Sequence, residues 1–152
     1  MFNASQSSGH RPASNALDGM WSKLDQCSEF IPNPTTAWWM AELPTYSTII
    51  NIRINRRGDC CFHRYGHVTV STSIDGTKWT LCKDLGDELS KKSWVSAVCP
   101  RGTKGNFVKI ESQIKEALML CEVEAYGSSL GKLNVLKTSN ILKFPKIASI
   151  DP

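Results

Sequence analysis

Two arginines and an aspartate, close together in the sequence, form the pattern best suited to binding chemistry. Arg57-Gly58-Asp59 is followed, after four intervening residues, by Arg64. An arginine side chain donates several N–H bonds in one fixed plane, so two arginines can clamp neighbouring hydroxyl groups of a ligand. The same tripeptide also suggests an integrin ligand. That use needs a flexible loop tip, and the Cys60-Cys61 pair that follows at once argues against one.

Six cysteines indicate disulfide bonds. They are Cys27, Cys60, Cys61, Cys82, Cys99 and Cys121. Their number is even and none shows the spacing of a zinc site, so we expect an oxidising compartment; six reduced thiols of a cytosolic protein are the alternative. Many connectivities are open, although the spacing alone favours Cys82–Cys99, which encloses 16 residues between two expected strands.

A bond between the adjacent residues Cys60 and Cys61 would be unusual. Neighbouring Cα atoms lie ~3.8 Å apart across a trans peptide, whereas ordinary disulfides span roughly 4.4–6.8 Å. Such a bridge requires a distorted peptide, and strain of that kind gathers at functional loops. Two free or differently paired thiols are the alternative.

Length favours one domain, and the charge distribution weighs against a nucleic-acid partner. The 152 residues suit a single core, and we expect a domain over 1–127 with a basic tail or linker over 128–152. The net charge is +4, but the basic residues form no run that could follow a phosphate backbone. No stretch approaches ~18 apolar residues, as a membrane span requires. The first residues lack the basic and apolar regions of a signal peptide.

Short segments of alternating apolar and polar residues predict an all-β fold. The alternation is clearest in 47–56, where Ile50, Ile52 and Ile54 should face one way. Further strands are expected at 67–73, 79–82, 94–98, 107–110 and 118–126. Strands at intervals of about ten residues, without a long amphipathic helix, indicate an antiparallel sandwich or barrel.

Five motifs in a fixed order resemble the F-type lectins, a family that includes fucolectins and is related to discoidin and coagulation factor 5/8 C domains. They are Ala4-Ser5-Gln6-Ser7-Ser8, Ala13-Ser14-Asn15-Ala16-Leu17-Asp18-Gly19, Trp38-Trp39, Arg57-Gly58-Asp59-Cys60-Cys61 and Leu120-Cys121-Glu122-Val123-Glu124. The resemblance covers about residues 4–127, and the family strand that precedes Ala4 is missing or shortened. It implies an eight-stranded jelly-roll β-sandwich, discoidin-like or galactose-binding-domain-like, with sugar and calcium sites in loops at one end.

This resemblance implies a non-catalytic domain that binds terminal L-fucose. Arg57 and Arg64 would bind the ring oxygen and hydroxyl groups, and Asp59 would hold an arginine in place. The disulfide Cys60–Cys61 would lie against the apolar face of the sugar. The family histidine that precedes this motif would fall at Glu29 or Phe30, and neither is histidine. Glu29 can accept a hydroxyl bond or pair with the arginines, and His63 is a partial substitute.

The resemblance also implies three disulfides and a structural calcium ion. The bridges would be Cys27–Cys121, Cys60–Cys61 and Cys82–Cys99. Asp18 and Glu122 would supply carboxylates to Ca²⁺, which takes roughly 6–8 oxygen ligands. Backbone or side-chain oxygens would come from Asn15, Met20, Gln26 and Cys121. The alternative is that Asp18 caps a turn and Glu122 is a solvated strand residue.

Two functions follow from these expectations. The first is recognition of fucosylated glycans or glycoproteins by a secreted lectin, in cell-surface recognition or innate defence. The second is a degenerate lectin domain that lacks the family histidine and binds a protein receptor in adhesion or gamete recognition. No nucleophile–base pattern indicates an enzyme, and a membrane-binding domain with apolar loop tips is disfavoured. Single sugar sites bind weakly, so we expect an oligomer or tandem module.

Overall fold

The computed structural model describes residues 3–9, 11–20, 23–32 and 36–130. Its strands are β1 (Ala4–Gln6), β2 (Ser28–Phe30), β3 (Trp38–Arg56), β4 (Val68–Ser73), β5 (Thr80–Gly86), β6 (Trp94–Val98), β7 (Lys104–Ser112) and β8 (Leu118–Ser129). Short helices are η1 (Ala13–Leu17), η2 (Leu24–Gln26), η3 (Phe62–Tyr65) and α1 (Glu88–Lys91). None of the helices in these ranges is long and apolar enough to span a membrane.

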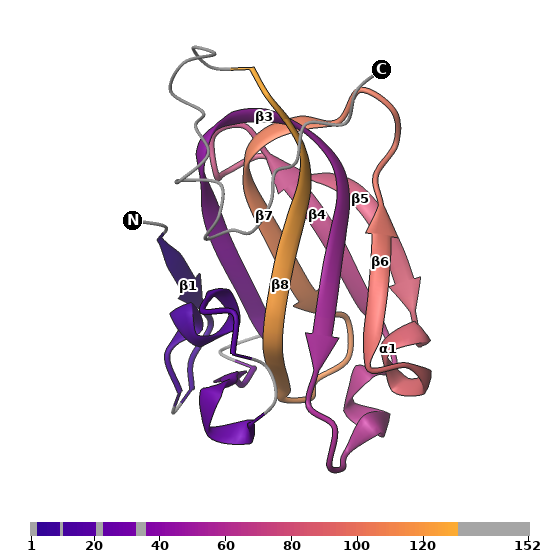
Figure 1. The fold of residues 1–152 in the computed structure, drawn as a ribbon. Helices are drawn as coiled ribbons and strands as arrows, with labels where there is room; N and C mark the ends of the chain where they lie inside the picture. Colours follow the sequence, from indigo (N-terminus) through magenta and orange to yellow (C-terminus); the bar gives the residue numbers. More distant parts are fainter. Residues whose placement is uncertain (1–2, 10, 21–22, 33–35, 131–152) are drawn as a thin grey trace.

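The long strand β3 builds the sandwich because its two halves belong to different layers (Figure 1). The first half pairs with β1 and β7, and the second half pairs with β6 and β8. One layer therefore has the order β1–β3–β7–β4–β5 and the other has the order β2–β8–β3–β6. The register between β3 and β7 shifts between Glu42 and Ser47, where the strand crosses from layer to layer. The expected all-β, eight-stranded antiparallel fold is confirmed.

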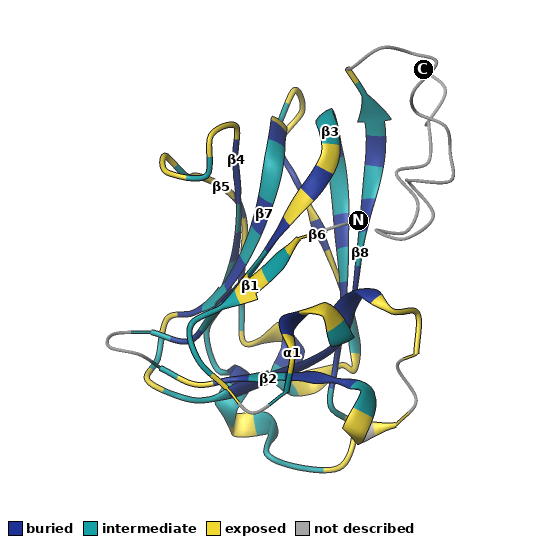
Figure 2. Cartoon of the chain, turned by 90° about the vertical axis from the view of Figure 1, so that its left-hand side faces the viewer, coloured by how far each residue is buried: buried dark blue, intermediate teal, exposed yellow. Residues whose placement is uncertain are grey.

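The core is a cluster of buried apolar residues contributed by strands of both layers, and buried positions recur along these strands (Figure 2). Ile52 and Ile54 are completely buried, as the alternation predicts. Ile50 is only half-buried, and Ile49 takes the inward position instead. The reason is a register shift between β3 and β8 directly after Ile49, which reverses the alternation there. Trp39 is also enclosed, and its indole N–H donates to a backbone carbonyl of η1 at 2.9 Å.

Several elements extend beyond the predicted strands. β3 begins at Trp38 rather than at residue 47, and β2 was not predicted at all. β8 continues through Ser129, two residues past the expected end of the domain at 127. The expected basic tail lies, from residue 131 onward, outside the described residues.

All six cysteines are paired as the resemblance implied. Cys82–Cys99 joins β5 to the residue after β6, so it closes one side of the sandwich between edge strands of opposite layers. Cys27–Cys121 joins the residue before β2 to β8. Disulfides of this density are typical of proteins from oxidising compartments.

Candidate functional site

The predicted arginines lie in a loop at one end of the sandwich. Residues 57–65, here called the arginine loop, follow the last residue of β3 and finish with η3. The loop ends on Tyr65, which is completely buried and whose hydroxyl donates to the carbonyl of Met119 on β8 at 2.7 Å. Burial raises the pKa of Tyr65 to about 12, so the phenol keeps its proton and the loop stays anchored to the neighbouring strand.

Arg57 and Asp59 bind each other through two parallel hydrogen bonds. Nε of Arg57 donates to Oδ1 of Asp59 at 2.7 Å, and Nη2 donates to Oδ2 at 2.8 Å. This contact lowers the pKa of Asp59 to about 2 and raises the pKa of Arg57, so both groups are charged at neutral pH. The chelate fixes the plane of one guanidinium. Because the two charges satisfy each other, the tripeptide does not present a separate cation and anion, as an adhesive loop tip would.

The vicinal disulfide separates the two arginines of the loop. Cys60 and Cys61 are bridged, with Cα atoms 3.7 Å apart. Cys61 has φ 68°, and no other non-glycine residue in the described ranges has a positive φ. That strained conformation turns the chain, and the Cys61 carbonyl then accepts the amide of Arg64 at 3.1 Å. Arg64 is half-buried, and its guanidinium has no hydrogen bond or ion pair within the described part of the chain, so it is free for a ligand.

Glu29 lies near the arginine loop, but Phe30 does not face it. Glu29 pairs with Met119 on β8, which is the strand beside β3. Its half-buried carboxylate contributes, after Asp59, to the raised pKa of Arg57. Phe30 is completely buried in the core, so its expected role as a sugar contact is corrected. Adjacent strand residues face opposite sides of a sheet, so Phe30 points into the core when Glu29 points outward, and it cannot take part in a surface site. His63 is exposed on η3.

The predicted calcium residues lie in a second corner, where the segment 15–27 meets β8. Glu122 is only 2% exposed, and its Oε1 atom is buried without a hydrogen-bond partner. Burial, and then the charge of Asp18, raises the pKa of Glu122 to about 8. Asp18 is exposed and accepts the amide N–H of Met20 at 2.8 Å. The structure therefore brings the two predicted carboxylates close enough to repel each other.

The remaining predicted ligands surround the same corner. The side-chain N–H of Asn15 donates to the carbonyl of Cys27 at 3.2 Å, and the side-chain nitrogen of Gln26 lies 3.4 Å from the sulfur of Met20. No three His, Cys, Asp or Glu side chains in the described ranges are grouped to hold a metal ion. A cation here would therefore take most ligands from carbonyl groups. That donor set, with one orphaned buried carboxylate oxygen, fits a hard cation such as Ca²⁺.

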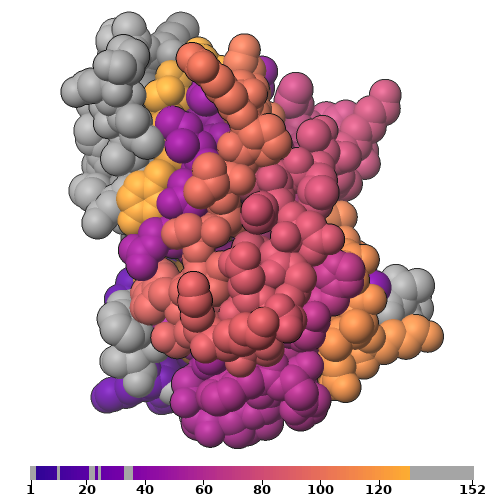
Figure 3. All heavy atoms as spheres, turned by 90° about the vertical axis from the view of Figure 1, so that its right-hand side faces the viewer, coloured from indigo at the N-terminus to yellow at the C-terminus, as the bar shows by residue number. Residues whose placement is uncertain are grey.

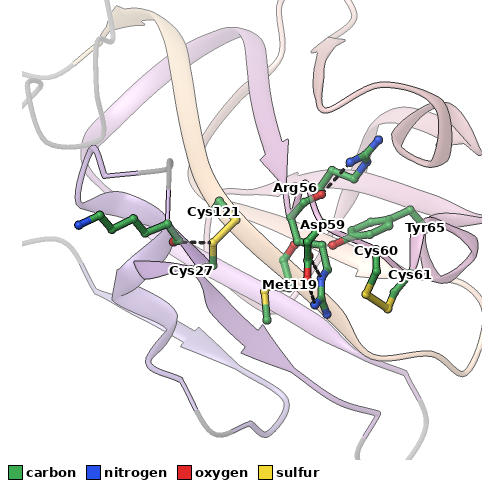
Figure 4. Close-up of polar contacts among 10 residues, drawn as sticks. Cys27, Arg56, Asp59, Cys60, Cys61, Tyr65, Met119 and Cys121 are labelled. Carbon is green, nitrogen blue, oxygen red and sulfur yellow. Dashed lines mark hydrogen bonds and ion pairs between the residues drawn. A yellow bond between two sulfur atoms is a disulfide. The ribbon is translucent and has the colours of Figure 1, made fainter. Parts of the chain in front are cut away.

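Strand β8 carries parts of both corners. Figure 4 shows the Cys27–Cys121 bridge on one side of Met119 and the vicinal disulfide on the other. The sequence did not reveal that Tyr65 and Met119 hold the arginine loop in place, because their hydrogen bond joins positions 54 residues apart. Nor did it single out Arg56, which is buried just before the arginine loop.

Comparisons with known proteins agree with this architecture. Residues 2–123 match the family described as the F5/8 type C domain. Fucolectin-4 of Anguilla japonica is 31% identical over 117 residues, which cover 74% of this chain and 65% of that protein. The chain covers 52% of the length of Fucolectin-1 from the same species, so it spans about half to two thirds of these curated relatives.

Two solved structures show the same fold. The lectin domain of lectinolysin complexed with Lewis b antigen aligns with a TM-score of 0.71 at 24% identity, covering 84% of this chain and 93% of that one. A Streptococcus pneumoniae fucose binding module aligns with a TM-score of 0.73 at 17% identity, covering 83% of this chain and 91% of that one.

Proposed function

This chain belongs to the F5/8 type C domain family as an F-type lectin domain, and we propose that it binds terminal L-fucose through the arginine loop. One observation carries the proposal: the guanidinium of Arg57 is held by Asp59, while the guanidinium of Arg64, across the vicinal disulfide, has no hydrogen bond or ion pair within the described residues. The fucolectin relatives and the fucose binding module support the choice of sugar.

The chemistry of the loop suits a small sugar with one apolar side. Two guanidinium groups donate N–H bonds to adjacent hydroxyls and to the ring oxygen. The Cys60–Cys61 bridge offers an apolar surface to the C–H groups and the methyl group of fucose. Glu29, half-buried two strands away, is the acceptor for a hydroxyl in place of the family histidine. The domain binds and releases its ligand without chemical change, as a carbohydrate-binding module does.

We further propose a structural calcium ion in the corner of Asp18 and Glu122. The buried Oε1 atom of Glu122, which has no partner, supports the proposal, because leaving such an oxygen unsatisfied costs free energy that a cation would offset. Asn15, Met20, Gln26 and Cys121 supply the remaining oxygens. The ion shapes the loop between η1 and β2 and does not touch the sugar.

The proposed setting is extracellular. Three disulfides keep their pairing only in oxidising surroundings. The ligands are fucosylated glycans or glycoproteins, and an oligomer or a tandem arrangement would raise the avidity of a weak single site.

Calorimetric titration with L-fucose, using D-galactose as the control sugar, tests the function. We expect saturable fucose binding by the oxidised, calcium-loaded protein, and loss of binding in Arg57→Ala and Arg64→Ala. Arg53→Ala is the matched control, because Arg53 lies on β3, the strand that leads into the loop, and pairs with Glu124 outside the loop. Folded wild-type protein that fails to bind millimolar fucose would overturn the proposal and favour recognition of a protein receptor.

A further inference from the structure

Arg56 is a buried arginine that pairs with no acidic side chain among residues 3–9, 11–20, 23–32 and 36–130. It is 6% exposed, and Arg56 and Glu122 are the two buried charged residues in the described part of the chain. Its hydrogen bonds go to backbone carbonyls, and burial lowers the pKa of Arg56. Removing a guanidinium from water in this way costs free energy unless its N–H groups are well satisfied. The contacts of Arg56 show what this burial achieves.

The guanidinium of Arg56 contacts the arginine loop on both sides of the vicinal disulfide. Nη1 donates to the carbonyl of Arg57 at 2.7 Å, before the bridge. The ring of Phe62 lies against the guanidinium, with its centroid 3.8 Å from Cζ, after the bridge. Nε donates to the carbonyl of Leu89 in α1. One side chain therefore joins both arms of the loop to a helix outside it.

The segment that follows α1 also holds the end of β3. The amide N–H of Arg56 donates to the carbonyl of Ser93 at 3.0 Å, and the side chain of Asn55 donates to the same carbonyl at 3.2 Å. Figure 3 shows the loop directly beneath this part of the surface. The α1 region therefore forms a platform against which the arginine loop rests.

We propose that Arg56 is a positioning residue, which fixes the separation of Arg57 and Arg64 by clamping both arms of the loop to α1. The role of those two arginines rests on the proposed function, but the clamp itself is independent of the ligand. Only arginine suits this position, because its planar group donates in two directions while its face packs on an aromatic ring. Lysine has a single ammonium group and lacks the planar face.

Two variants and a matched control test the clamp. Arg56→Lys and Arg56→Met should bind L-fucose about tenfold more weakly, through loss of charge-assisted hydrogen bonds that preorganise the site. Amide hydrogen exchange is the second readout. The amide of Arg64, bonded to the Cys61 carbonyl, should exchange about tenfold faster, while amides of β4 and β7 keep their protection. Arg53→Met, which removes an arginine stacked on Trp94 at 4.5 Å outside the loop, should change neither readout.

The outcomes separate this inference from the proposed function. If wild-type protein does not bind fucose, the proposed function fails, and the exchange of the Arg64 amide alone decides the clamp. Unchanged exchange and affinity in folded Arg56→Lys would overturn the inference. Faster exchange throughout the sheets would overturn it as well, because that pattern marks a general loss of stability.

Discussion

Calcium binding should release a proton from Glu122, by an amount that follows from the structure. In metal-free protein, burial and then the charge of Asp18 raise the pKa of Glu122 to about 8. At pH 7 roughly nine of ten folded molecules therefore carry this carboxyl protonated. The proposed Ca²⁺ would bind the carboxylate form, so each ion bound at pH 7 should displace nearly one proton. Its apparent affinity should fall about tenfold between pH 7 and pH 6.

The same shift fixes the pH dependence of stability. The pKa of Glu122 in the folded protein lies above its usual value of 4.5. The stabilisation that protonated Glu122 contributes is therefore complete below pH 4.5 and is lost as the pH rises through 8. Metal-free protein should lose as much as about 5 kcal/mol of unfolding free energy over that interval. Calcium-saturated protein should not show this loss, because the ion stabilises the charged form.

Titration calorimetry in two buffers of different ionisation enthalpy counts the released protons. Glu122→Gln keeps the shape of the side chain and removes its titration, so it should abolish calcium binding and flatten the stability profile of metal-free protein. Glu124→Gln is the comparison on the same strand: Glu124 pairs with Arg53 and Tyr126, so the variant should still bind calcium, with a lower pKa of Glu122 because the charge of Glu124 also raises it. Calcium binding without proton release, with equal affinity at pH 6 and pH 8, would refute the reasoning.

Three further changes test the elements that support the two sites. Replacing Cys82 and Cys99 by serine should lower the unfolding free energy in urea by about 3 kcal/mol, since their sequence separation is 17; unchanged stability would contradict this. Tyr65→Phe should cost about 1–2 kcal/mol for a lost buried hydrogen bond. Near-ultraviolet titration of the wild type should show one phenol, that of Tyr65, with a pKa of about 12. Ionisation of all the phenols near pH 10 would count against the anchor. Gly9→Ala places a Cβ 1.7 Å from the carbonyl oxygen of Glu29, so β2 must shift, and both melting temperature and fucose affinity should fall.

Strands with a clear alternation were predicted, whereas β2 and the first half of β3, which show none in sequence, were missed. Segments 47–56 and 67–73 place one face on the core, and this geometry imposes a period of two residues. The first half of β3 opens with Trp38-Trp39-Met40, whose three apolar residues carry no such period. β2 has only three residues, too few to establish a pattern. Its register decides that Glu29 faces outward and Phe30 inward, which the sequence position alone left open.

The site was predictable where its parts are close in sequence. Arg57, Asp59 and the cysteine pair meet because a tight loop leaves them little freedom, so the motif alone places them together. The contacts that hold this loop were not predictable in the same way. Arg56 reaches Leu89 and Tyr65 reaches β8 across long stretches of chain, and only the packing of the two layers brings those partners together.

The two candidate sites depend on each other because three closely spaced residues of β8 serve them. The carbonyl of Met119 holds Tyr65 at the end of the arginine loop, Cys121 is bridged to Cys27, and the carboxylate of Glu122 lies near Asp18. Strand β8 is paired by β3 from Leu120 to Ser129, and β2 pairs with it only at Leu118–Leu120, beside the carbonyl that holds Tyr65. A calcium ion that satisfies Glu122 would therefore steady the strand on which the loop rests, and would affect sugar affinity without contacting the sugar.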